Sequence, residues 1–186
     1  MSRISRRHLL LSLPALAMAP RVWAQAATPQ LRVRGLNQMT LSVSDVKRSL
    51  DFYQGLFGMP IQARHGAGAT LLRIGSGPQF FALSPVAAGA TPGISRYGIG
   101  VEAFNVDRIL RALADHGVRR VDAAGADGWS GGPMTVRVRM RGPEAGGARE
   151  GTPEIFLGDP SGIVVQLQDP SYCGGAGALG NVCPAP

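Results

Sequence analysis

The chain has 186 residues, of which 45% are apolar and 17% are charged, and its formal net charge is +7. This length accommodates one domain with a substantial core. The positive charge does not indicate nucleic-acid binding. Four arginines fall within residues 1–26, and the remaining 15 basic residues face 12 acidic ones, which leaves a charge of +3. The sequence also contains no basic run with interleaved aromatic residues.

Residues 1–26 have the pattern of a signal peptide. Early arginines precede an apolar run over residues 9–18, and Ala24-Gln25-Ala26 resembles a small-residue cleavage site. The stretch SRRHLL at residues 5–10 is typical of the twin-arginine route, with a general secretory signal as the alternative. The apolar run is too short for a stable membrane span. We therefore expect a periplasmic or secreted protein with no stable membrane anchor after cleavage.

A first structural unit follows a linker over residues 27–34. Residues 36–44 alternate as in a strand, and Asp45 can cap a helix that Gly58 closes. The spacing places four apolar residues on one face of this helix, namely Val46, Leu50, Tyr53 and Phe57. Glycines then separate three further strands, which we expect at residues 59–64, 69–74 and 78–84.

The same order of elements then starts again. Residues 96–103 read as a strand, Asn105 as a helix cap and Gly117 as the helix end, and Val46–Leu50 resembles Val106–Leu110 at a distance of 60 residues. Strands are expected at residues 118–122, 134–140, 153–158 and 163–168, with loops at 123–133 and 141–151. An internal βαβββ repeat leaves each half with an uncovered sheet face, so the two halves should pair.

The C-terminal segment, residues 171–186, is a glycine-rich tail with the only two cysteines, Cys173 and Cys183. In an oxidising compartment we expect them to form a disulfide that pins the tail, and the alternative is two free thiols. Closing so short a loop stabilises by roughly 3 kcal/mol at most. Two cysteines without nearby histidines do not make a metal site.

The strand TVRVRMR at residues 135–141 has two chemically different faces. Alternation puts Val136, Val138 and Met140 on one face and Arg137, Arg139 and Arg141 on the other. If the apolar face packs on a helix, the arginines line the open side of the sheet and indicate an anionic ligand. The alternative is a solvated edge strand whose arginines only prevent further pairing.

Three segments carry a resemblance to a known family. They are LSVSDVKRSLDFYQGLFGM, GIGVEAFNVDRILRALADHGV, and the turn GDPSG before IVVQLQDP. Over residues 35–170 the chain resembles the vicinal-oxygen-chelate superfamily, which includes glyoxalase I, extradiol dioxygenases, and fosfomycin and bleomycin resistance proteins. The resemblance implies an α+β fold in which two βαβββ modules form a cupped mixed sheet, and it implies a homodimer.

In this superfamily a divalent metal usually lies in the cup. The resemblance places Gln38, Ala82, Arg96 and Gln166 at the four ligand positions. Arginine has no acceptor atom and stays charged, and alanine cannot ligate. We therefore expect no bound metal, with a divalent metal as the alternative. His65 and His116 read as surface residues.

These observations predict a small-molecule-binding protein. The expected ligand is anionic or oxygen-rich, and the expected binding residues are Gln38, Arg96, Arg137, Arg139 and Gln166. The alternative is a metal-dependent glyoxalase-like lyase or isomerase, or an enzyme related to the dioxygenases. The sequence identifies no catalytic residue.

Overall fold

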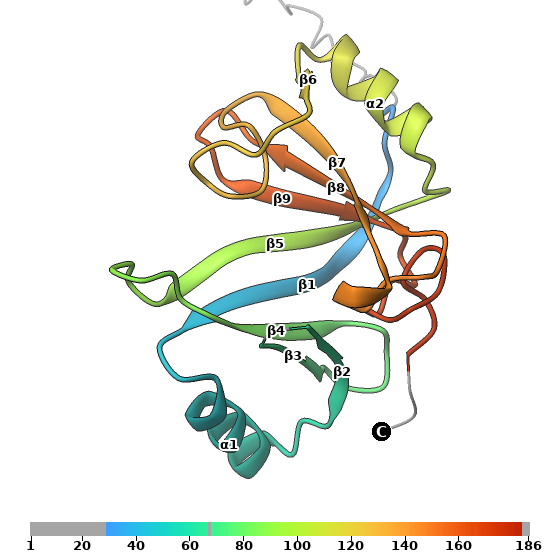
Figure 1. Cartoon of the computed structure of the whole chain (residues 1–186). Coiled ribbons are helices and arrows are strands. Elements are labelled where there is room, and N and C mark those ends of the chain that lie inside the picture. Colours follow the sequence, from blue (N-terminus) through green and yellow to red (C-terminus); the bar gives the residue numbers. More distant parts are fainter. Residues whose placement is uncertain (1–28, 67, 184–186) are drawn as a thin grey trace, which may run out of the picture.

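The structure is a computed structural model that describes residues 29–66 and 68–183, and these residues form one nine-stranded mixed sheet with two α-helices (Figure 1). The strand order is β2-β3-β4-β1-β5-β9-β8-β7-β6. The sheet curves into a cup that stays open on one side. The predicted signal peptide lies outside the described residues. In the part of the chain that is described, no helix is long and apolar enough to cross a membrane.

The two predicted modules are both present. The first consists of β1 (Val33–Val43), α1 (Val46–Phe57), β2 (Ile61–His65), β3 (Ala69–Arg73) and β4 (Phe80–Pro85). The second consists of β5 (Gly93–Val101), α2 (Val106–Asp115), β6 (Arg119–Val121), β7 (Thr135–Arg141), a short 3₁₀ turn (Pro143–Ala145), β8 (Thr152–Gly158) and β9 (Val164–Gln168). The second module therefore has one more strand than the first, the three-residue β6.

The modules meet through their first strands at the centre of the sheet. β1 and β5 pair antiparallel, and each pairs on its other side with the last strand of its own module, β1 with β4 and β5 with β9, in parallel. Gln38 lies opposite Gly98, and Arg96 lies opposite Thr40. Gln38 and Arg96 therefore lie two positions apart along the β1–β5 pair, on the same face of the sheet.

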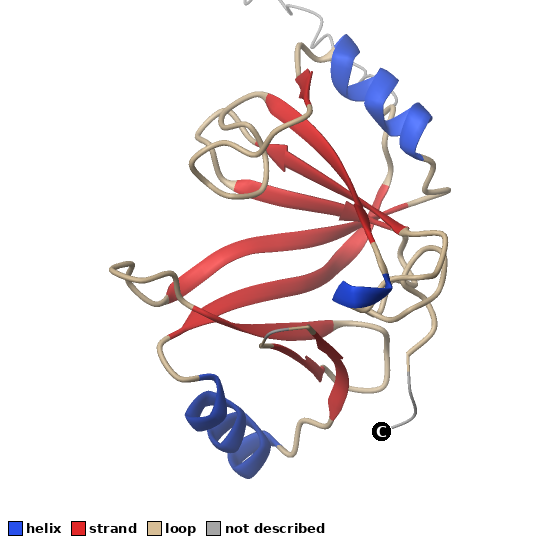
Figure 2. Cartoon of the chain, in the orientation of Figure 1, coloured by secondary structure: helices blue, strands red, loops and turns tan. Residues whose placement is uncertain are grey.

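The helices lie outside the sheet, one with each module (Figure 2). The Asp45 carboxylate accepts a hydrogen bond from the Arg48 N–H at 2.9 Å, and Asn105 caps α2 in the same way. Gly58 ends α1 at φ +63°, a conformation that favours glycine. These caps explain why both helices start where the sequence predicts.

The two helices differ in how much apolar surface they bury. α2 buries Ile109 and Leu113 in a core with Val136 of β7 and Ile155 of β8. α1 buries no residue completely, and Phe57 is 62% exposed. The expectation that Phe57 belongs to the packed face is wrong, because the small sheet of the first module covers only part of the helix.

β7 is an amphipathic strand that pairs along its whole length with β8. On its other side β6 pairs only with residues 135–137, so among the described residues 138–141 have no strand partner there, and the edge-strand alternative applies to this half of β7 alone. Val136 and Val138 pack against the α2 core. Met140 is not part of this core and is 57% exposed.

The C-terminal tail folds back onto the first module. Tyr172 is 2% exposed, and its ring lies 5.9 Å from that of Phe80 on β4. A disulfide joins Cys173 to Cys183 and closes the glycine-rich loop between them. The tail therefore forms part of the wall of the cup.

Candidate functional site

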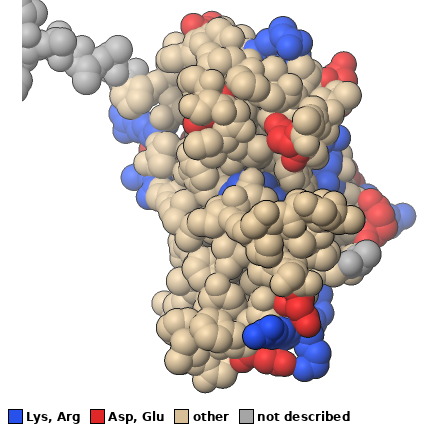
Figure 3. Space-filling view, turned by 90° about the vertical axis from the view of Figure 1, so that its left-hand side faces the viewer, with Lys and Arg blue, Asp and Glu red and all other residues tan. Residues whose placement is uncertain are grey.

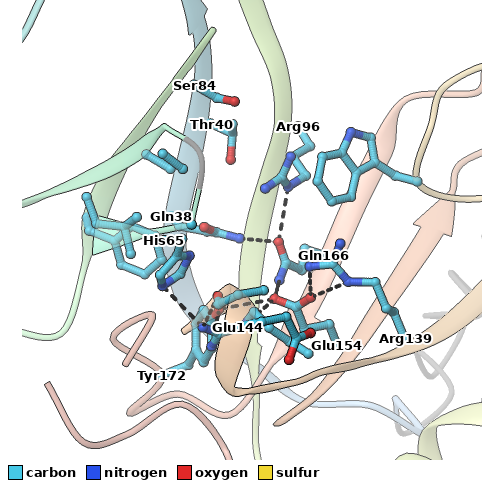
Figure 4. Close-up of a pocket in the computed structure, with 18 residues that line it drawn as sticks. Gln38, Thr40, His65, Ser84, Arg96, Arg139, Glu144, Glu154, Gln166 and Tyr172 are labelled. Carbon is cyan, nitrogen blue, oxygen red and sulfur yellow. Dashed lines mark hydrogen bonds and ion pairs between the residues drawn. The ribbon is translucent and has the colours of Figure 1, made fainter. Parts of the chain in front are cut away.

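A cavity of about 310 Å³ lies in the cup, between the two modules (Figure 4). We call it the cup cavity. Its size is at the lower end of the range for small-molecule sites. Every strand except β6 contributes to its lining, as do the 123–133 loop, the 3₁₀ turn and the tail. Its polar and charged lining residues are Gln38, Thr40, His65, Ser84, Arg96, Arg139, Arg141, Glu144, Glu154, Gln166 and Tyr172.

Two buried amides lie at the base of the cup cavity. The Gln38 Nε2 group donates to Gln166 Oε1, and Gln166 Nε2 donates to Glu154 Oε1 at 3.4 Å. The first of these bonds crosses β5 at Gly98. A Cβ on Gly98 would lie 2.5 Å from Gln38 Cγ, so glycine is what lets the two amides meet.

Arg96 enters the cup cavity from β5 and lies against an aromatic ring. Its guanidinium carbon is 3.7 Å from the centroid of the Trp129 indole, and its Nε donates to Gln166 Oε1 at 3.2 Å. Burial lowers the pKa of Arg96 to about 10, so the group stays charged at neutral pH. Among the described residues, no carboxylate lies within ion-pair distance of Arg96, which leaves its terminal nitrogens available to a ligand.

The other two arginines of the cavity share one carboxylate. Arg139 donates from Nε and Nη2 to Glu154 Oε2, at 2.9 and 2.6 Å. Arg141 forms an ion pair with Glu154 Oε1 at 3.2 Å. The side chains of Arg141 and Glu154 are 1% and 5% exposed, so this pair is shielded from solvent. Unlike Arg96, both arginines have a carboxylate partner, and the three groups together carry a net charge of +1.

Arg141 also donates hydrogen bonds to backbone carbonyls of the loop after β7 and of the C-terminal tail. Its guanidinium donates to Gly146 O at 2.7 Å and to Gly175 O at 3.1 Å. His65 Nε2 is hydrogen-bonded to Gly174 O and lies 3.1 Å from Arg141 Nη1. Burial, reinforced by the charge of Arg141, lowers the pKa of His65. The tail is thus tied to the charged end of the cup cavity.

Tyr172 presents its hydroxyl to the same charged cluster. The Tyr172 hydroxyl donates to Glu154 Oε1 at 3.4 Å and accepts from Arg141 Nη2 at 3.3 Å. Burial, together with the negative charge of Glu154, raises the pKa of Tyr172. Tyr172 therefore remains neutral and serves as a fixed hydrogen-bonding group.

Four of the five predicted binding residues line the cup cavity, and the fifth does not. Gln38, Arg96, Arg139 and Gln166 lie together there. Arg137 instead donates to the carbonyls of Asp122 and Trp129, at 3.3 and 3.4 Å, and so supports the 123–133 loop. Its assignment to the ligand site is not supported by its position.

Sequence reasoning missed several residues of the site. His65 was expected at the surface but lines the cup cavity, whereas His116 is exposed as expected. Glu154 lies directly opposite Arg139 in the β7–β8 pair, a relationship that depends on strand register. Trp129 lies in a loop without periodicity, and Tyr172 in the tail, so neither carried a recognisable signal.

The residues at the four expected ligand positions do not fit a divalent metal. All four line the cup cavity, but they supply two neutral amides, a methyl group and a guanidinium. The Gln166 oxygen already accepts hydrogen bonds from Gln38 and Arg96. Within residues 29–66 and 68–183, no group of three His, Cys, Asp or Glu side chains could hold a metal ion. Hard and borderline cations need carboxylates or imidazoles in such positions.

Comparisons with solved structures agree with the fold. The chain is similar to methylmalonyl-CoA epimerase from Mycobacterium tuberculosis, with 18% identity and a TM-score of 0.50 over 74% of this chain and 89% of the epimerase. It is also similar to homoprotocatechuate 2,3-dioxygenase from Brevibacterium fuscum, with 17% identity and a TM-score of 0.53 over 76% of this chain and 38% of the dioxygenase. At these identities the likeness concerns the fold alone.

Comparisons of sequence identify the family. No curated protein sequence matches the chain. A family model described as the Glyoxalase/Bleomycin resistance protein/Dioxygenase superfamily matches residues 35–167. This match covers most of the chain and both βαβββ modules. The chain therefore belongs to the Glyoxalase/Bleomycin resistance protein/Dioxygenase superfamily.

Proposed function

We propose that the protein binds a small anionic or oxygen-rich organic molecule in the cup cavity, through Arg96 and without a divalent metal. The observation that carries the proposal is the state of Arg96. Its guanidinium lies against Trp129, keeps its charge at neutral pH and lacks a carboxylate partner among the described residues, and the residue is partly exposed. A carboxylate or phosphate of the ligand would supply that partner, and arginine suits both groups.

The charge balance of the cup cavity supports an anion. Three guanidinium groups, those of Arg96, Arg139 and Arg141, surround one buried carboxylate, Glu154. The second carboxylate, Glu144, is exposed at the rim. Charges of one sign repel more strongly in a partly desolvated site than in water, so an incoming anion would relieve this excess. Glu154 already pairs with two arginines, so Arg96 is the one of the three that lacks a carboxylate partner among the described residues.

Thermal unfolding tests the proposal. Acetate, benzoate and inorganic phosphate should be screened with the EDTA-treated mature chain, and at least one should raise the melting temperature in a concentration-dependent way. Arg96→Met should abolish this response, whereas Arg120→Met, which changes an exposed arginine of β6, should keep it. Equal responses of the two variants, or no response of the wild type to any anion, would refute the proposal.

We further propose that the mature protein acts outside the cytoplasm, after removal of residues 1–26. The sequence of this segment supports export, and so does the disulfide between Cys173 and Cys183, a bond that persists in oxidising compartments. Substitution of Arg6 and Arg7 by lysine should retain the chain in the cytoplasm if the twin-arginine route is used. Unchanged recovery in the periplasmic fraction would exclude that route.

A further inference from the structure

A second cavity, of about 520 Å³, adjoins the cup cavity. We call it the outer cavity. Ser84, Arg96 and Trp129 line both cavities. The rest of the outer cavity is lined by Ser42, residues 85–87, 90 and 91, residues 93–95 at the start of β5, and residues 126–128. In a space-filling view of one side of the molecule, Lys or Arg atoms are visible in a hollow near the centre, with mostly uncharged surface around it (Figure 3).

The strand geometry shows that the two cavities are successive parts of one trough. Alternate residues of a strand face the same side. On β1, Gln38 and Thr40 line the cup cavity, and the next residue on that side, Ser42, lines the outer cavity. On β5, which runs in the opposite direction, Arg96 lines both cavities. A register shift follows it and pairs Gly93 with Ser42, and Gly93 and Ile94 line only the outer cavity. Arg96 therefore lies at the junction.

An unsatisfied hydroxyl marks the same junction. Thr40 is 1% exposed and lies directly opposite Arg96 in the β1–β5 pair. Its Oγ1 atom is buried and has no hydrogen-bond partner among the described residues. A buried hydroxyl without a partner is costly, so a ligand oxygen held there would satisfy both Thr40 and Arg96. Figure 4 shows Thr40, Ser84 and Arg96 at one end of the cup cavity.

The outer cavity differs chemically from the charged end of the cup cavity. Its lining is mostly apolar or small, and its larger apolar members are Pro85, Val86, Ile94 and Trp129. Ile94 is 64% exposed, so its apolar surface is open to contact with a ligand. The charged lining residues of the outer cavity are Arg96 and Asp127, and the Asp127 carboxylate is already hydrogen-bonded to Trp129 N and Ser130 Oγ.

We propose that the ligand is an amphiphilic monoanion, with its oxyanion on Arg96 and Thr40 and its apolar portion in the outer cavity against Ile94 and Trp129. This inference rests on the function proposed above and adds the ligand's shape and class. Arg96, the guanidinium of the cup cavity that has no carboxylate partner among the described residues, suits one oxyanion. The second volume, on the side of Arg96 away from Glu154, suits an aliphatic or aryl tail.

A chain-length series tests the inference. Trp129 is the only tryptophan outside residues 1–26, so its fluorescence reports directly on the junction. Acetate, butyrate, hexanoate and octanoate should be titrated into the mature protein, with octanamide as the uncharged control. Each added methylene should tighten binding by roughly two- to fourfold until the outer cavity is filled. Octanamide should bind at least tenfold more weakly than octanoate.

Matched variants assign the tail to the outer cavity. Ile94→Asn should weaken octanoate at least fivefold and leave acetate within twofold. Ile163→Asn, which changes another exposed isoleucine (54% exposed) that lines neither cavity, should change neither titration.

The possible failures are distinguishable. Carboxylates that bind independently of chain length, or equal effects of the two asparagine variants on octanoate, would overturn the inference and leave the proposed function intact. Carboxylates that do not bind although inorganic phosphate does would overturn the inference alone. Octanamide binding as tightly as octanoate, or no binding of any carboxylate or of phosphate, would overturn the proposed function and the inference with it.

Discussion

Gln38 on β1 and Gln166 on β9 are hydrogen-bonded to each other across β5, the strand that lies between them. The contact is possible because the intervening position, Gly98, has no side chain. The bond holds the Gln166 amide so that its oxygen also accepts from Arg96. The position of the proposed anion-binding group thus depends on a glycine in the centre of the sheet.

Gly98→Ala should destabilise the protein by about 1–3 kcal/mol, because the new Cβ would lie 2.5 Å from Gln38 Cγ. Gly93→Ala is the matched control, since a Cβ at that position of β5 meets nothing within 4 Å. Urea unfolding measures both changes. Adding Gln38→Ala to Gly98→Ala should restore part of the loss, and equal stability of the two alanine variants would contradict the clash.

Glu154→Gln should lower the free energy of unfolding by about 3–5 kcal/mol, because it leaves the buried Arg141 guanidinium without a counter-charge. Glu102→Gln removes the solvent-exposed ion pair with Arg34 and should cost no more than about 1 kcal/mol. Chemical denaturation of the two variants tests this difference. Similar losses in both would mean that Glu154 does not neutralise Arg141.

Reduction of the disulfide should lower the free energy of unfolding by about 3 kcal/mol, the chain-entropy value for a loop of this length. The bond holds the tail that supplies the Gly174 and Gly175 carbonyls to His65 and Arg141. Urea unfolding with and without reductant measures the effect, and a Cys173→Ala/Cys183→Ala variant should not respond to reductant. Two titratable thiols in denatured, unreduced mature protein would contradict the prediction.

Acidification should destabilise the protein through His65. Its pKa in the folded protein lies below the ordinary value of 6.5, so between these two values the unfolded chain binds a proton that the folded chain does not. The free energy of unfolding should therefore fall as the pH drops below 6.5, by less than about 1.4 kcal/mol per pH unit. His65→Gln should flatten this part of the pH profile, and His116→Gln, at an exposed position, should not. Identical slopes in wild type and His65→Gln would remove His65 as the cause.

The elements of the fold were largely predictable because their signals are local. Asp45, Gly58 and Asn105 mark helix ends through contacts with residues a few positions away, and alternation marks the strands. The burial of α1 was not predictable to the same degree. Periodicity shows which face of a helix is apolar, but the number of covered residues depends on how far the sheet extends beneath it, as Phe57 shows.

The candidate site was predictable only where the family pattern or strand alternation applied. Gln38, Arg96 and Gln166 follow from the repeat, and Arg139 follows from the two faces of its strand. Glu154 required the register of the β7–β8 pair, and Trp129 required the path of an irregular loop. Arg137 lies on the same face of the strand as Arg139, but its guanidinium donates to two carbonyls of the 123–133 loop and its flank. Strand alternation cannot predict these contacts, because they depend on the path of the loop.

The most direct test of the central claim is an NMR titration of hexanoate into EDTA-treated, ¹⁵N-labelled mature protein, followed at the Arg96 Nε–H and Trp129 Nε1–H signals. Metal-independent binding at Arg96 predicts that both signals shift and saturate together, and that the Trp129 signal stops responding in Arg96→Met. Signals that do not move, that move equally in Arg96→Met, or that move only after a divalent metal is added would contradict it.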